Sequence, residues 1–147
     1  MIAALQAVNR LRARALLPLA AAMGIIVAVP ALAEPNFVGI WYSAYQPDEP
    51  NVISLIEFKA DGTFYEEFRK CSDGDFVGYQ FESGTWSVMD GIERVMVKMI
   101  NGDAANVEDT YAVELLTDSE RRIRMDDRTF VSHRVERFEF PQCPTGA

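Results

Sequence analysis

Apolar and polar residues alternate along most of the chain after residue 36, and no window there carries a sustained helical stripe. The segment IERVMVKMI, residues 92–100, shows a period of two, with Ile92, Arg94, Met96 and Lys98 alternating with Glu93, Val95, Val97 and Met99. A period of two residues is that of a strand, whose successive side chains point to opposite faces of a sheet. The pattern therefore predicts an all-β domain.

Turn signals divide this alternating region into about eight strands. Asp61-Gly62, Asp90-Gly91 and Asn101-Gly102 are typical hairpin turns, and the connections between strands are short. Short strands in regular succession favour a single antiparallel up-and-down β-barrel, which has no exposed edge. The predicted strands cover residues 37–45, 52–59, 64–70, 79–89, 92–100, 110–116, 121–125 and 129–140.

The hairpin at Asp61-Gly62 allows two registers. A three-residue loop with Gly62 as a bulge pairs Phe58 with Phe64, whereas a two-residue loop pairs Phe58 with Tyr65. The bulged form gathers more apolar groups on one face, so it is the one we expect. It also places Glu66 on the apolar face, where a buried carboxyl group needs a partner such as an arginine.

The first 33 residues have the three parts of a secretory signal peptide. Arg10, Arg12 and Arg14 precede an apolar run, and small residues follow at Ala31 to Ala33. The run is shorter than the roughly 20 residues that cross a bilayer. We therefore expect residues 1–33 to be removed, residues 34–147 to form one domain, and the protein to be periplasmic or secreted without stable membrane insertion.

Charge excludes some partners. The leader holds three of the 14 basic residues and none of the 22 acidic ones, so the mature chain has a net charge of −11. A surface of this sign repels phosphate backbones and anionic lipid, which argues against nucleic-acid binding. The oligomeric state has no signal in the sequence.

Cys71 and Cys143 are the only cysteines, and both follow the leader. Export to an oxidising compartment favours a disulfide between them, which would tie the C-terminal tail to the chain near Lys70. Neither cysteine has a neighbouring histidine, so a zinc site is disfavoured.

Four motifs in order resemble the bacterial lipocalin-like domains of the calycin group. They are Gly39-Ile40-Trp41, IEFKADGTF from Ile56, GTWSVMDG from Gly84 and YAVELLTDSERRIRM from Tyr111. The resemblance implies a small exported β-barrel in which Trp41 packs at the closed end. It also implies a late basic residue over that tryptophan, and Arg134 or Arg137 could serve by a cation–π contact.

Catalytic and metal-binding signals are weak. His133 is the only histidine, and no nucleophile-elbow motif accompanies it. Asp73-Gly74-Asp75 lacks the ligand spacing of a calcium loop, so it is interpreted as a turn. We expect a protein that is not an enzyme and has no cofactor.

The leading hypothesis is binding of a small apolar or amphipathic molecule inside the barrel. The alternative is a side-chain-filled barrel that acts as a protein-interaction or inhibitor module through its outer surface and its loops at residues 46–51 and 71–78. The candidate interior residues are the aromatic ones of the predicted strands: Trp41, Phe58, Phe64, Phe68, Tyr79 and Trp86.

Overall fold

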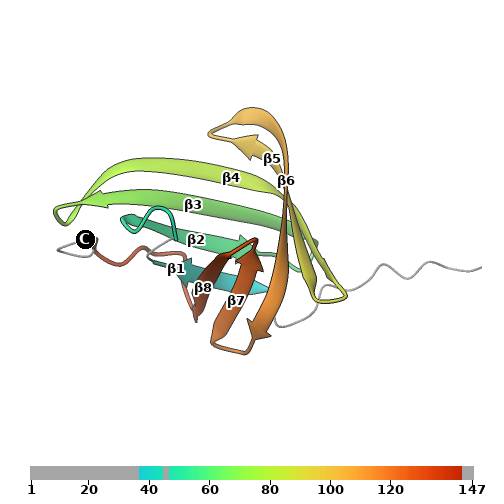
Figure 1. Ribbon diagram of the computed structural model, residues 1–147. Coiled ribbons are helices and arrows are strands. Elements are labelled where there is room, and N and C mark those ends of the chain that lie inside the picture. Colours follow the sequence, from blue (N-terminus) through green and yellow to red (C-terminus); the bar gives the residue numbers. More distant parts are fainter. Residues whose placement is uncertain (1–36, 45–46, 144–147) are drawn as a thin grey trace, which may run out of the picture. The chain divides into compact units, whose positions relative to one another are not determined.

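The computed structural model describes residues 37–44 and 47–143, and the regular elements in them are all strands. Each strand pairs antiparallel with the next, and β1 pairs with β8, so the sheet closes (Figure 1). The predicted all-β, up-and-down barrel is confirmed. The strands are β1 Gly39–Ser43, β2 Val52–Phe58, β3 Thr63–Ser72, β4 Asp75–Met89, β5 Ile92–Ile100, β6 Asp103–Leu116, β7 Glu120–Met125 and β8 Arg128–Val135.

Four of the hairpins have two-residue turns, and in three of these turns both residues have a positive φ. This backbone matches the right-handed twist of paired strands, and Asp, Asn and Gly adopt it at the lowest cost. The sequence pairs that form these turns are Asp73-Gly74, Asp90-Gly91 and Asn101-Gly102.

The hairpin between β2 and β3 has the bulged register that we expected. Phe58 lies opposite Phe64, and Gly62 has a φ of +80°. The main-chain N–H and the hydroxyl of Thr63 both donate to Oδ1 of Asp61, at 3.0 and 2.6 Å. This register also directs Glu66 into the barrel, beside Phe64 and Phe68 in the alternation of β3.

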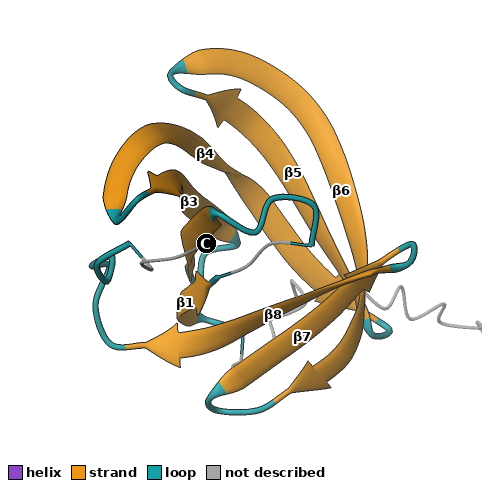
Figure 2. Ribbon diagram, turned by 60° about the vertical axis from the view of Figure 1, so that its left-hand side comes forward, coloured by secondary structure: helices purple, strands orange, loops and turns teal. Residues whose placement is uncertain are grey.

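Some strands differ in length from the prediction. β4 and β6 begin at Asp75 and Asp103, in segments whose glycines and acidic residues resembled loops. Main-chain pairing with β3 and β5 overrides those local preferences, because each ladder continues to its two-residue turn. The predicted last strand instead ends at Val135, where the chain leaves the sheet (Figure 2).

Both tryptophans close one end of the barrel. Trp41 is fully buried, and its indole N–H donates to the carbonyl of Phe37 at 2.9 Å. Trp86 packs against Phe37 and Phe58, with ring centroids 5.7 and 5.0 Å away, and donates to the carbonyl of Lys59. The two indoles are therefore the floor of the barrel, and each satisfies its N–H within the protein.

The cation over Trp41 is Arg134 rather than Arg137. Its guanidinium carbon lies 4.2 Å from the centre of the Trp41 ring, and Nη1 donates to the carbonyl of Val38 at 2.7 Å. A Cβ atom on Gly39 would lie 2.2 Å from Nη1 of Arg134. Gly39 also has a φ of +138°, so both its backbone conformation and the position of the guanidinium favour glycine there.

The C-terminal tail covers the outer face of β2. Ile53 and Leu55 alternate with the inward residues of that strand, yet both are at most 1% exposed. The disulfide between Cys71 and Cys143 is confirmed, with the Cα atoms 5.6 Å apart, and it holds Phe140 in a cluster with Ile53. A second small core therefore lies outside the barrel wall.

The predicted signal peptide, residues 1–33, lies outside the described residues. Among the residues that are described, none forms a helix long and apolar enough to cross a membrane.

Replacing both Cys71 and Cys143 with alanine is expected to lower the free energy of unfolding by about 2–4 kcal/mol, because the crosslink restricts the unfolded chain. Urea denaturation of the variant and of the wild type measures the difference. The reduced wild type serves as the control and should match the variant. An unchanged midpoint would contradict a stabilising role for the crosslink.

Gly39→Ala should destabilise the protein by about 3 kcal/mol, through backbone strain and displacement of Arg134. Gly102→Ala is the matched control, since Gly102 also has a positive φ but has open space at its Cβ position. Its expected cost is about 1–2 kcal/mol, from backbone strain alone. If urea denaturation shows that the two variants lose the same unfolding free energy, the contact with Arg134 is not the reason for glycine at position 39.

Candidate functional site

A cavity of about 180 Å³ lies inside the barrel above the tryptophan floor. One part of its wall is apolar, and the other part carries hydroxyl, carboxyl and guanidinium groups. The lining residues are Ser43, Ser54, Ile56, Glu66, Phe68, Glu82, Val95, Asp109, Tyr111, Arg121, Ile123 and Phe130. The cavity is therefore amphipathic, with more ionisable groups than a core of this size normally holds.

Arg121 is the only basic residue in the lining, and its guanidinium forms an ion pair with Glu93. Its Nε donates to Oε2 of Glu93 at 3.1 Å and its Nη2 to Oε1, so the pair is bidentate. Nη1 donates to Ser132, and the guanidinium carbon lies 5.1 Å from the centre of the Phe58 ring. Glu93 is fully buried. The positive charge of Arg121 is compensated by the negative charge of Glu93, so Arg121 would attract an anionic ligand only weakly.

Glu66, Glu82 and Asp109 supply the remaining carboxyl groups. Burial is the main cause that raises the pKa of Glu66 to about 8, and the negative charge of Glu82 acts in the same direction. Burial also raises the pKa of Glu82, opposed by a hydrogen bond from Gln80 and reinforced by the charge of Asp109. Three carboxyl groups therefore face the cavity, and Glu66 keeps its proton at neutral pH.

Tyr111 adds a neutral hydroxyl to this group. Burial is the main cause that raises its pKa, and the charges of Asp109, Glu66 and Glu93 act in the same direction. The phenol therefore stays protonated and can donate or accept a hydrogen bond. Its ring packs edge to face on Phe130, which fixes its position in the wall.

The carboxyl groups do not form a metal centre. Within residues 37–44 and 47–143, no three His, Cys, Asp or Glu side chains are arranged to hold a metal ion. His133 is exposed on the outer side of β8, opposite Tyr42 of β1. Asp73-Gly74 forms a hairpin turn, as interpreted from the sequence.

The residues that the sequence suggested for the interior lie in three places: the cavity wall, the buried floor beneath it and the outer surface of the barrel. Phe68 lines the cavity. The buried cluster beneath it contains Trp41, Phe58, Phe64 and Trp86, so these residues form the floor and not the ligand-facing wall.

The prediction of an interior Tyr79 is wrong. Tyr79 is 72% exposed, and its ring lies 5.1 Å from that of Phe81 in a tilted contact on the outside of β4. Gln80 and Glu82 pair with the inward Phe68 and Glu66, so Tyr79 must point outward. The odd spacing between Tyr79 and Trp86 already places them on opposite faces of one uninterrupted strand.

Sequence reasoning found Glu66 but missed Glu82, Asp109, Tyr111 and Arg121. A signal for Arg121 exists, because it alternates with Ile123 and therefore shares the inner face of its strand. Asp109 has no such signal, because it lies just before the strand predicted at residues 110–116. Only the register between strands brings these side chains together.

A family model for the lipocalin-like domain matches residues 36–120, which is more than half of the chain. The chain therefore belongs to the lipocalin-like family, as its motifs indicated. Among solved structures, it is similar to a lipocalin-like protein from Bacteroides uniformis, at 13% identity and a TM-score of 0.44. That match covers 68% of this chain and 99% of the other. No curated protein matches the chain in sequence.

The free energy of unfolding should fall as the pH rises from about 5 to about 8. Over this range Glu66 keeps its proton in the folded state and loses it in the unfolded chain. Glu66→Gln keeps the size of the side chain but removes its titration, so its unfolding free energy should change less over this range. Urea denaturation at several pH values measures the slope, which is at most about 1.4 kcal/mol per pH unit for one group.

Glu57→Gln is the control for this experiment, because Glu57 is a carboxylate on the outer face of the neighbouring strand. It should keep the slope of the wild type. A Glu66→Gln slope equal to that of the wild type would contradict a protonated Glu66 in the cavity.

Proposed function

We propose that this protein binds a small amphipathic molecule in the barrel cavity, and that the ligand carries a cationic or hydrogen-bond-donating group. One observation carries the proposal: Glu66, Glu82 and Asp109 face the same cavity, while its single arginine is bound to Glu93. A positively charged ligand would relieve the repulsion among these acids. The apolar wall would receive the hydrocarbon part of the ligand.

The size of the cavity limits the ligand. Drug-sized molecules occupy pockets of about 300–1,000 Å³, whereas this cavity measures about 180 Å³. A long fatty acid fits neither the volume nor the sign of the charge. A compact organic ammonium ion with one aromatic or aliphatic group matches both parts of the wall. Its charge would face the carboxyl groups and its hydrocarbon group would face the apolar residues.

The proposed role is binding and not catalysis. The residues that would hold the ligand are Glu66, Glu82, Asp109 and Tyr111, and Phe68 would contact its apolar part. The predicted signal peptide supports a location outside the cytoplasm, in the periplasm or secreted. In that location the protein would sequester or deliver its ligand.

Phenethylammonium and 3-phenylpropanoate test this proposal, because they are similar in size and opposite in charge. Isothermal titration calorimetry at neutral pH should detect binding of the ammonium ion and not of the carboxylate. Glu82→Gln should weaken ammonium binding about tenfold, which corresponds to one lost charge-assisted hydrogen bond. The exterior variant Glu57→Gln should bind as the wild type does.

Two results would contradict the proposal. One is binding of 3-phenylpropanoate as tight as that of phenethylammonium. The other is ammonium binding that Glu82→Gln leaves unchanged, which would place the site outside the cavity. Native mass spectrometry of the purified protein complements the titration by showing whether a small molecule is retained.

A further inference from the structure

Strand β6 continues well beyond its neighbour β7. The pairing between them spans only Ala112 to Leu116, whereas β6 begins at Asp103. The first part of β6, residues 103–111, pairs with β5 on one side. Within the described part of the chain, no strand pairs with its other side, and the β5–β6 hairpin extends past the β7–β8 hairpin (Figure 2). We call residues 103–111 the free edge.

The main-chain groups on the free edge can be assigned. The N–H of Val113 donates to the carbonyl of Gly91 at 2.8 Å, so this pair is hydrogen-bonded across β5 and β6. Hydrogen-bonded pairs alternate along an antiparallel ladder, which directs the main-chain groups of Tyr111 and Asp109 toward β5. The N–H and C=O groups of Thr110 and Glu108 therefore point to the free side, and both residues are exposed.

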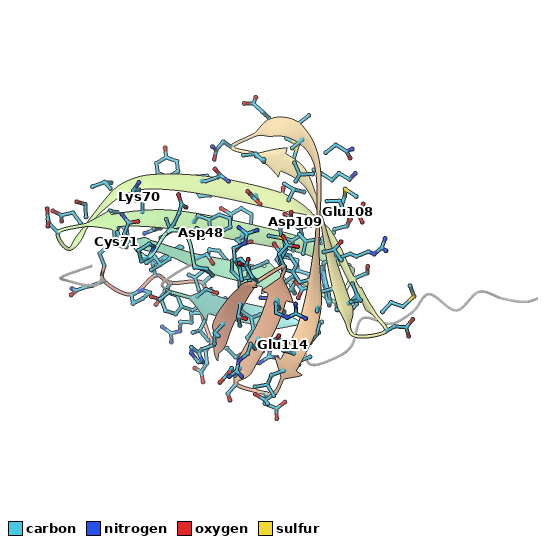
Figure 3. The ribbon with its side chains drawn as sticks, viewed as in Figure 1. Asp48, Lys70, Cys71, Glu108, Asp109 and Glu114 are labelled. Atoms are coloured by element: carbon cyan, nitrogen blue, oxygen red, sulfur yellow. A yellow bond between two sulfur atoms is a disulfide. The ribbon has the colours of Figure 1, made fainter. Side chains whose placement is uncertain are left out.

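The side chains along this edge have two distinct faces. Asp109 and Tyr111 line the cavity, while Glu108 alternates to the outer face and approaches Arg94 at 3.4 Å (Figure 3). Asp109 acts on Glu82 as a like charge and raises its pKa. The inner face of the free edge therefore carries the carboxyl group of Asp109, with that of Glu82 from β4 near it.

We propose that the free edge of β6 binds an extended segment of another protein by adding a strand to the sheet. The segment carries lysine or arginine at alternate positions, which point to the inner face beside Asp109. Main-chain hydrogen bonds to Thr110 and Glu108 supply the pairing, and the opposite charges set the choice of partner.

A second copy of this chain fits the free edge less well. Two such edges in contact would bring together two sets of Asp103, Glu108 and Asp109, and like charges on paired strands are destabilising. The exposed Val107, on the same edge, would be covered by either partner. Charge complementarity therefore favours a basic segment.

A synthetic decapeptide of alternating threonine and lysine tests the proposal. Calorimetry at low salt should detect its binding to the whole protein, and a threonine–glutamate decapeptide of the same length should not bind. A threonine–lysine peptide methylated on alternate main-chain nitrogens keeps its charge but loses its donors, and we expect its affinity to fall about tenfold or more. Equal binding of the methylated peptide would overturn the proposal.

Two variants locate the peptide on the protein. Thr110→Pro removes the main-chain N–H on the free side, which proline at a sheet edge allows, and peptide binding should fall about tenfold. Thr110→Ala keeps that N–H and should bind as the wild type does. Hydrogen exchange should show protection of the Thr110 and Glu108 amides on binding, and protection confined to other strands would overturn the proposal.

The edge and the cavity are tested separately. Thr110→Pro leaves all the cavity carboxyl groups in place, so phenethylammonium should still bind if the proposed function holds. Loss of peptide binding with retained ammonium binding supports the edge site. A dimer of the wild-type protein in analytical ultracentrifugation that Thr110→Pro dissociates would overturn the choice of partner and assign the edge to a second copy.

Discussion

The contact between Arg134 and Trp41 joins the first and last strands, and the closed barrel depends on it. β1 and β8 pair through only three residues of each strand, so their main-chain ladder is short. Arg134 reinforces this seam by covering the indole ring and donating to the carbonyl of Val38. Gly39 makes room for the guanidinium, since any side chain there would collide with it. The Gly-x-Trp motif thus contributes to the contact between the first and last strands.

Closure creates an interior, and the pairing of Arg121 determines its charge. The bidentate contact with the fully buried Glu93 uses the only basic group of the cavity wall. Removing one member of such a pair leaves an uncompensated buried charge, so both residues are constrained. The other acids then face the cavity without a basic partner of their own. The same ion pair therefore leaves carboxyl groups as the ionisable groups of the cavity wall that have no basic side chain bound to them.

The barrel is closed at its floor but not along its whole length. β6 extends beyond β7, so the sheet has a free edge where the β5–β6 hairpin leaves the barrel. The tail protects another part of the outer surface, where the disulfide and Phe140 pack in a cluster with Ile53. The same sheet thus combines a sealed floor, a polar cavity and an exposed edge, because its strands differ in length.

Much of the architecture follows from local signals in the sequence. Period-two alternation and the Asp-Gly and Asn-Gly turns determined the number and order of the strands, and the bulge at Gly62 determined the register that turns Glu66 inward. The two isolated cysteines predicted the disulfide. These features depend on neighbours in the chain, and neighbours are visible in a sequence.

Only the tertiary structure decided which side chains meet. Arg121 and Glu93 are 28 residues apart, and Arg134 and Val38 are 96 residues apart, so their contacts depend on how ladders are placed in register. The sequence could not choose between Arg134 and Arg137, nor show that β6 continues past β7. Those properties arise from pairing between distant strands, where a shift of one residue moves every side chain to the opposite face.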